Sequence, residues 1–210
     1  MKTLGICRLA SIAVFAVLVM GATLPAAGAA GPLEKVRTTV DAIIALLRQD
    51  LPAEVKETKI SSMIRENFDL RTMAQGILAT NWKKASDAEK KRFQELFTEL
   101  IETTYSGQLD TYTYDNEEVK YLSEKIKGRK ALVETVVVTS SAEIPVQYKL
   151  VNKGGGWRAY DVQVEGVSLI RTYRDSYKEI VKKEGISGLL TKMEAKIEEL
   201  RNAPPPGGKE

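Results

Sequence analysis

The stretch WRAYDVQVEGVSLIRTYRDSY, residues 157–177, contains a change of hydrophobic period that decides the fold class. Up to Val164 the apolar side chains alternate with other residues, as in a β-strand with one buried face. From Val167 onward the apolar residues recur at intervals of three and four, which is the spacing of an amphipathic helix. The pattern therefore predicts a strand that leads directly into a helix across a short link.

The residues before this stretch have the period of a sheet from about Glu118. Val133, Thr135 and Val137 alternate with their neighbours, and β-branched residues are enriched. Two links, residues 128–130 and 152–156, contain glycine and are typical of hairpins. The glycine triplet in the second link does not indicate a phosphate loop, because a phosphate loop needs a helix directly after it and here strands flank it.

Strand parity predicts which side chains share a face of the sheet. On the strand that starts near Ile144, alternate residues as far as Leu150 should share one face, with Val146 and Tyr148 between them. On the next strand Tyr160, Val162 and Val164 should share one face. The sequence does not decide which face meets a ligand.

Helical spacing is found on both sides of the predicted sheet. A first helix should begin near Pro32, and a weaker pattern follows the break at residues 51–52. Asp69 can cap a third helix. Ser86 and Glu89 have the spacing of a capping box, and they precede the strongest helical pattern in the chain.

After the sheet, the helix that starts near Val167 should end at Gly185, and Ser187 should open a last helix. Consecutive strands with short links form an antiparallel sheet, and such a sheet needs helices over one face to bury it. The sequence thus predicts an α+β fold: a single mixed domain with an antiparallel twisted sheet covered by helices on one side.

The N-terminal residues 1–30 have the pattern of a cleaved secretory signal peptide. Lys2 and Arg8 precede an apolar run from residue 9 to residue 20, and small residues follow at 26–30. The run is shorter than the roughly 20 residues of a membrane span. An uncleaved anchor is the alternative. We expect the folded domain to be 31–201 and residues 202–210, rich in proline and glycine, to be a disordered tail.

Composition excludes several classes of protein. The 210 residues include 31 basic and 28 acidic side chains, a net charge of +3, which is too balanced for a protein that binds nucleic acid through clustered cations. Histidine is absent and Cys7 is the only cysteine. Zinc sites of the usual kind and catalytic triads with histidine are therefore excluded, and no metal or cofactor is expected.

Four carboxylates stand near apolar positions and could in principle act as acids or bases, namely Asp69, Glu143, Asp161 and Glu165. Each has a structural role open to it as a cap, a turn anchor or a strand end. We therefore expect no catalytic residue, and no enzyme.

Three stretches together resemble the MlaC family of periplasmic phospholipid carriers, which belong to the Mla system for lipid asymmetry and are also known from toluene tolerance. They are FDLRTMAQGILATNWKKAS at 68–86, RFQELFTELIETTYSGQL at 92–109, and the stretch at 157–177 quoted above. The chain differs from the family at Ala79, where the family usually has glycine.

The resemblance implies a cone-shaped, NTF2-like sheet with an internal apolar cavity that holds the acyl chains of a phospholipid with two chains or more. It also implies a periplasmic location. The implied partners are an inner-membrane ABC transporter with an MCE-domain subunit and an outer-membrane lipoprotein associated with a porin. The protein would shuttle lipid between these two complexes.

Apolar and aromatic positions of the predicted elements supply the candidate lipid-binding residues. They are Met73, Ile77, Phe97, Ile101, Tyr105, Val146, Tyr148, Val162, Val164, Val167, Ile170 and Tyr173. The head group could meet Arg158, Arg171 or Arg174, although a solvated surface position is as good a role for each. Two alternatives remain at this stage, a small enzyme of the cone fold that uses tyrosine and aspartate on an apolar substrate, and a periplasmic adaptor without ligand.

Overall fold

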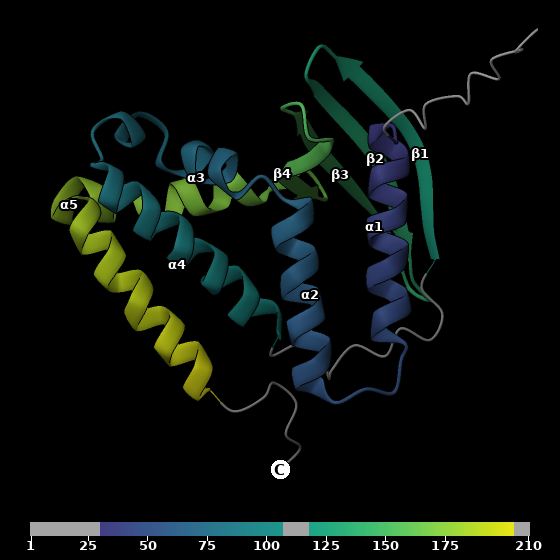
Figure 1. The fold of residues 1–210 in the computed structure, drawn as a ribbon, viewed down its shortest axis with the longest axis horizontal. Coiled ribbons are helices and arrows are strands. Elements are labelled where there is room, and N and C mark those ends of the chain that lie inside the picture. Colours follow the sequence, from purple (N-terminus) through teal and green to yellow (C-terminus); the bar gives the residue numbers. More distant parts are fainter. Residues whose placement is uncertain (1–29, 107–117, 204–210) are drawn as a thin grey trace, which may run out of the picture.

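Five antiparallel strands form one sheet, in the order in which they follow one another along the chain (Figure 1). The computed structural model describes residues 30–106 and 118–203. The strands are β1 (Glu118–Lys127), β2 (Lys130–Val138), β3 (Glu143–Asn152), β4 (Trp157–Val164) and β5 (Val167–Ser168). Both predicted hairpin links, between β1 and β2 and between β3 and β4, are confirmed.

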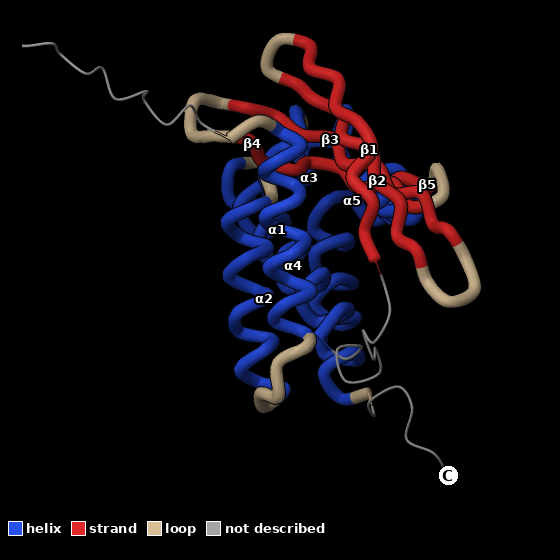
Figure 2. Tube along the Cα trace, turned by 90° about the vertical axis from the view of Figure 1, so that its right-hand side faces the viewer, coloured by secondary structure: helices blue, strands red, loops and turns tan. Residues whose placement is uncertain are grey.

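Helices precede and follow this sheet, and α1, α2 and α4 lie below it in Figure 2. The helices are α1 (Pro32–Leu47), α2 (Ala53–Asn67), α3 (Leu70–Leu78), the 3-10 helix η1 (Ala79–Lys83), α4 (Asp87–Ser106) and α5 (Leu169–Asn202). The predicted α+β class is confirmed. None of these helices combines the length and the apolar content that a membrane span requires. The predicted signal peptide and tail fall almost entirely on residues 1–29 and 204–210, outside the described ranges.

The helix ends follow the capping chemistry that the sequence predicts. Asp69 Oδ1 accepts a hydrogen bond of 2.8 Å from Thr72 N at the start of α3. Ser86 and Glu89 form the capping box at α4, because Glu89 Oε2 accepts from Ser86 N at 2.8 Å and Ser86 Oγ accepts from Glu89 N at 3.2 Å. Gly185 has φ 70° and ψ −172°, which breaks α5 and turns its second half in a new direction (Figure 1).

Ala79 follows α3 in a strained conformation. Its φ of 50° and ψ of −120° lie in a region that L-residues with a Cβ rarely adopt. Glycine would have no such strain. The resemblance noted above places glycine at this position in the family, and the backbone supplies the physical reason.

A β-bulge corrects the predicted parity of β4. Leu150 pairs with Ala159 whereas Lys149 pairs with Asp161, so that Tyr160 has no partner on β3. The extra residue in β4 reverses the alternation, so that side chains before and after the bulge no longer follow one parity. Tyr160 therefore does not share a face with Val162, and the prediction that these side chains lie together was wrong.

The apolar interior is divided into two separate clusters. The helical cluster joins α3, α4 and α5, with Phe93, Phe97 and Leu189 fully buried at its centre. The sheet cluster lies where α1 packs on the sheet and contains Val36, Ala131, Val133 and Leu150.

Candidate binding site

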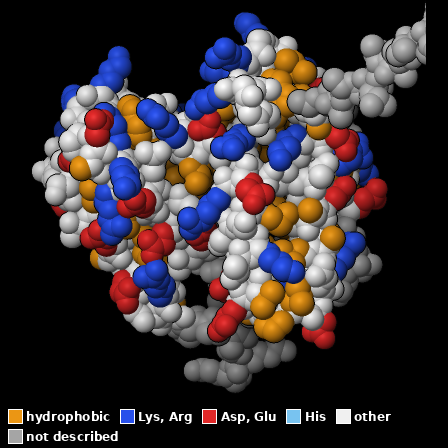
Figure 3. Space-filling model, viewed as in Figure 1, with side chains coloured by type: hydrophobic (Ala, Val, Ile, Leu, Met, Phe, Trp, Pro, Cys, Tyr) orange, Lys and Arg blue, Asp and Glu red, His pale blue; other side chains and the backbone are white. Residues whose placement is uncertain are grey.

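An apolar pocket of about 400 Å³ lies between the helical cluster and the sheet cluster. Every major element except η1, β1 and β2 supplies part of its wall. The apolar lining residues are Val36, Val40, Ile43, Leu47, Ile60, Ile64, Phe68, Leu70, Met73, Ile101, Tyr148, Leu150, Ala159, Val162, Val164, Val167 and Leu169. On the face drawn in Figure 3, the surface is hollowed between the part built by α4 and α5 and the part built by α1 and α2.

The apolar stripe of α1 explains why this pocket exists. Val36, near the start of the stripe, packs on the sheet at the edge of the pocket and is 5% exposed. Farther along the stripe, Ile43 and Leu47 face the pocket and are only half-buried. One helix face therefore begins as ordinary core and continues as the wall of a pocket.

The pocket opens at the β4–β5 turn. Val164 and Val167 line it, yet their exposed fractions are 45% and 64%. Apolar side chains that are exposed singly are common on protein surfaces, but two at the edge of an apolar pocket form an apolar rim. The pocket meets solvent at this rim.

The only titratable side chain other than a lysine in this lining is Tyr148. Burial raises the pKa of the Tyr148 hydroxyl, an effect that outweighs the lowering by its hydrogen bond with Thr135. The phenol therefore stays neutral at physiological pH. The described wall of the pocket carries no negative charge.

The structure brings together six of the twelve predicted lipid-binding residues. They are Met73, Ile101, Tyr148, Val162, Val164 and Val167, all of which line the apolar pocket. Their contact with lipid stays a prediction, as it does for the others.

Other predicted residues lie away from the pocket wall. Ile77, Phe97, Ile170 and Tyr173 pack in the helical cluster, where the Phe97 and Tyr173 rings meet edge to face with centroids 5.2 Å apart. The helical cluster is therefore filled by its own side chains. Val146 is buried on β3 but does not line the pocket.

Tyr105 belongs to α4, but its side chain lies outside what the structure describes.

The lining residues supplied by α1 and α2 were not predicted from the sequence. Residues such as Val40, Ile43 and Ile60 have the same spacing as core residues, and nothing in a helical period distinguishes a face that packs from one that borders a pocket. The one signal in the sequence was the weak apolar pattern of α2, a helix in which no residue is buried.

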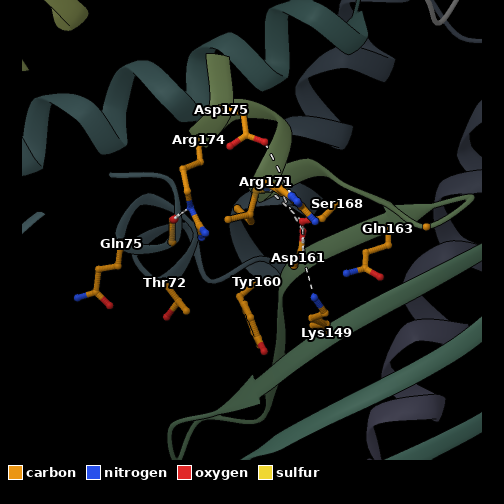
Figure 4. A pocket seen from close by; sticks show the side chains of 13 residues that line it. Thr72, Gln75, Lys149, Tyr160, Asp161, Gln163, Ser168, Arg171, Arg174 and Asp175 are labelled. Atoms are coloured by element: carbon orange, nitrogen blue, oxygen red, sulfur yellow. Dashed lines mark hydrogen bonds and ion pairs between the residues drawn. The ribbon is translucent and has the colours of Figure 1, made fainter. Parts of the chain in front are cut away.

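A second pocket, of about 770 Å³, is polar and lies against α3, α5 and the neighbouring strands (Figure 4). At its wall Asp161 is 3% exposed and accepts hydrogen bonds from three donors. Ser168 Oγ lies 2.8 Å from Asp161 Oδ2, Lys149 Nζ lies 3.1 Å from Oδ2, and Ile170 N lies 3.2 Å from Oδ1. Asp161 thereby holds the first turn of α5 to the sheet.

Two of the three arginines considered for a head group, Arg171 and Arg174, line this polar pocket. Arg174 Nε donates to Gly76 O at 2.8 Å, at the C-terminal end of α3, and Arg171 faces Asp175 at 3.8 Å. Arg158 is an exposed residue of β4. None of the three lines the apolar pocket.

Within the described ranges, no group of three or more acidic, histidine or cysteine side chains could hold a metal ion.

Comparison with known proteins agrees with this architecture. The sequence profile of the family described as MlaC protein matches residues 37–195, about three quarters of the chain. The chain belongs to the MlaC family. Within that family, it is 29% identical over 124 residues to the intermembrane phospholipid transport system binding protein MlaC of Haemophilus influenzae, which covers 56% of this chain and 57% of that protein.

A second MlaC-like relative is the toluene tolerance protein ttg2D of Pseudomonas putida, 30% identical over 105 residues, or 49% of this chain and 48% of that protein. The match thus spans about half the length of each of these two relatives. A solved phospholipid-binding protein from Ralstonia solanacearum, in complex with a phospholipid, superposes with a TM-score of 0.74 and 22% identity. It covers 82% of this chain and the whole of that one, which shows that the MlaC fold is shared.

Proposed function

We propose that this protein binds a phospholipid by its acyl chains in the apolar pocket and carries it through an aqueous compartment. One observation carries the proposal. The chain does not close its two hydrophobic clusters against each other, and it leaves an apolar space between them that opens at an apolar rim. The names of the relatives, which refer to phospholipid transport and phospholipid binding, support this choice of ligand.

The free-energy cost of exposing acyl chains to water explains why a carrier is needed. A phospholipid with two chains exposes about thirty CH₂ groups, each costing about 0.8 kcal/mol in water, so an uncovered lipid faces a penalty on the order of 20 kcal/mol. A pocket that replaces the bilayer as solvent for the chains removes the part of this penalty that belongs to the CH₂ groups it covers. Exchange between two apolar environments can then run in either direction.

The size of the pocket fits the role of a ligand site. Its volume of about 400 Å³ is within the range of about 300–1,000 Å³ typical of small-molecule pockets. The exposed rim at Val164 and Val167 gives chains a route that avoids passing through packed core.

The predicted signal peptide and the family support a periplasmic setting for this proposal. The protein would act in the periplasm and receive or deliver lipid at an inner-membrane ABC transporter with an MCE-domain subunit. The second docking partner would be an outer-membrane lipoprotein associated with a porin. Net direction would come from the ATP-driven partner.

The alternative that the protein is an enzyme is less well supported, because the carboxylate best placed to act as an acid or base already has a structural role. It needs a buried carboxylate beside a tyrosine, and Asp161, next to Tyr160, is the buried aspartate of the polar pocket. Its oxygens already accept from Ser168, Lys149 and Ile170 N. Asp161 has a complete structural role as the anchor of α5.

Organic extraction of the gently purified protein, followed by mass spectrometry, tests the proposal. Phospholipid should copurify at close to one molecule per chain. Delipidated protein should take up phospholipid again from vesicles. A protein without an apolar pocket, separated from the vesicles by the same protocol, controls for carry-over of vesicle lipid. A protein that contains no lipid and takes up none would overturn the carrier function and favour the adaptor without ligand.

A further inference from the structure

The polar residues of the apolar pocket are gathered at one end of α1. Three side chains in the wall are neither apolar nor aromatic: Lys35, Thr39 and Asn67. Lys35 and Thr39 are one turn apart on α1 and therefore lie on the same face of the helix. Thr39 Oγ1 donates to Asn67 Oδ1 at 3.0 Å. The pocket thus has a polar end and an apolar remainder.

Two of these three side chains have their hydrogen bonds satisfied by the protein. Asn67 Oδ1 accepts from Thr39, and Asn67 Nδ2 donates to Met63 O at 2.7 Å. Lys35 differs from them. Its ammonium makes no hydrogen bond or ion pair with any side chain in the described parts of the chain, although Lys35 is half-buried at the pocket wall.

The position of Lys35 on α1 makes its unpaired positive charge less favourable. Lys35 lies close to the N-terminus of the helix, where the helix dipole is positive and an acidic residue is the favourable choice. Two acidic side chains at this helix end are already engaged. Glu124 Oε2 accepts from Leu33 N at 2.7 Å, and Glu34, in the first turn of α1, pairs with Arg37 at 3.7 Å. An anion next to Lys35 would therefore be favoured both by the ammonium and by the helix dipole.

We propose that Lys35 is a specificity-determining residue that binds the phosphate of the lipid, so that the pocket selects phosphate-bearing amphiphiles over neutral lipids with the same chains. The inference rests on the proposed function. The phosphate lies at the polar end formed by Lys35, Thr39 and Asn67, and the acyl chains extend along Ile43 and Leu47. The long apolar stem of Lys35 lines the pocket while its charged end reaches the phosphate, as lysines do at other apolar boundaries.

A pair of lipids with identical chains separates this inference from the proposed function. The probes are phosphatidylglycerol and diacylglycerol with the same fluorescent acyl chains, offered to the delipidated protein in vesicles of otherwise neutral lipid. A charge-assisted hydrogen bond is worth enough to change affinity about tenfold or more. Wild type should bind phosphatidylglycerol about tenfold more tightly than diacylglycerol.

The Lys35→Met variant keeps the apolar stem and removes the charge. It should lose about tenfold in affinity for phosphatidylglycerol and bind diacylglycerol as wild type does, so that the preference disappears. Lys35→Arg should keep the preference. Lys59→Met, at an exposed position of α2, makes the same change of net charge and should leave both affinities unchanged.

Each contrary result has a distinct meaning. Equal wild-type binding of both lipids, or an equal loss for both in Lys35→Met, would overturn the role of Lys35 and leave the carrier function intact. Binding of neither lipid by wild type would overturn the carrier function itself. Competition by inorganic phosphate at concentrations comparable to the lipid would show that the site binds free phosphate, which would overturn the assignment to a lipid phosphate.

Discussion

Asp161 on β4 and Ser168 at the N-terminus of α5 are joined through both carboxylate oxygens, with Ser168 Oγ at 2.9 Å from Oδ1 and 2.8 Å from Oδ2. Ser168 Oγ in turn accepts from Arg171 N at 3.1 Å. The buried carboxylate thus orients the residue that caps α5. Through this chain of bonds, the sheet fixes the direction in which the longest helix leaves it.

Asp161→Asn should destabilise the protein by about 2–3 kcal/mol. The amide keeps the shape but loses one acceptor oxygen, and the ammonium of Lys149 loses its charged partner at 3.1 Å. Asp175→Asn is the matched control, because Asp175 is exposed and its contact with Arg171 is 3.8 Å long, so its effect should stay under about 0.5 kcal/mol. Urea unfolding followed by circular dichroism measures both. Equal effects would show that the Asp161 bonds do not hold α5.

Acid should remove part of the stability through Asp69. Burial acts to raise the pKa of Asp69, but the hydrogen bonds from Lys153 Nζ, at 2.7 Å, and from Thr72 outweigh it and hold the pKa below its ordinary value of 3.8. A carboxyl whose pKa is lowered by folding stabilises the protein above its unfolded pKa and loses that contribution as pH falls through the folded value.

The Asp69→Asn variant isolates this contribution, because asparagine is also a good N-cap. Wild type should be the more stable protein at pH 6, and the difference should shrink as pH falls below about 4. Unfolding free energies measured from pH 6 to pH 2.5 give the answer. A difference that is independent of pH would mean that the charge of Asp69 contributes nothing.

Ala79→Gly should stabilise the protein by about 1 kcal/mol. The substitution relieves the strain of φ 50° and ψ −120°, which exceeds the cost of the greater freedom of glycine in the unfolded chain. Ala195→Gly, at an exposed position inside α5, should have the opposite sign and cost about 1 kcal/mol. Thermal unfolding of the two variants provides the comparison, and a destabilising effect at Ala79 would contradict the conformation described for this residue.

Val162→Trp should block lipid uptake with little effect on folding. The indole would fill part of the apolar pocket, whose volume is about 400 Å³, and leave the packed clusters on either side in place. Arg158→Trp adds the same side chain at an exposed position of the same strand and should leave uptake unchanged. Uptake of phospholipid from vesicles should fall at least about tenfold for Val162→Trp alone. Normal uptake by this variant would remove Val162 from the binding site.

The sequence predicted the features that depend on local chemistry. Caps at Asp69 and Ser86, the hairpin links and the break at Gly185 follow from residue types that favour one backbone conformation, and the structure confirms them. The bulge at Tyr160 could not be predicted, because it depends on pairing with β3 and leaves no mark on the alternation of β4 itself.

The location of the pocket depends on tertiary packing in the same way. Phe97 and Ile101 are one turn apart on α4 and both are buried, yet only Ile101 borders the pocket. Sequence spacing puts both on the inner face of the helix. Phe97 meets the ring of Tyr173 on α5, whereas Ile101 meets open space. The helices that pack against α4 decide this difference, and no local pattern contains that information.

The division of the interior into a helical cluster and a sheet cluster bears on how the protein melts. Two apolar units with a gap between them need not lose structure in a single cooperative step. Without ligand, the van't Hoff enthalpy from calorimetry should fall below the calorimetric enthalpy. A bound molecule that touches both units would couple them, so the ratio should approach one while the melting temperature rises. A bound lipid would then act as part of the hydrophobic core, because it would fill the space between the helical cluster and the sheet cluster.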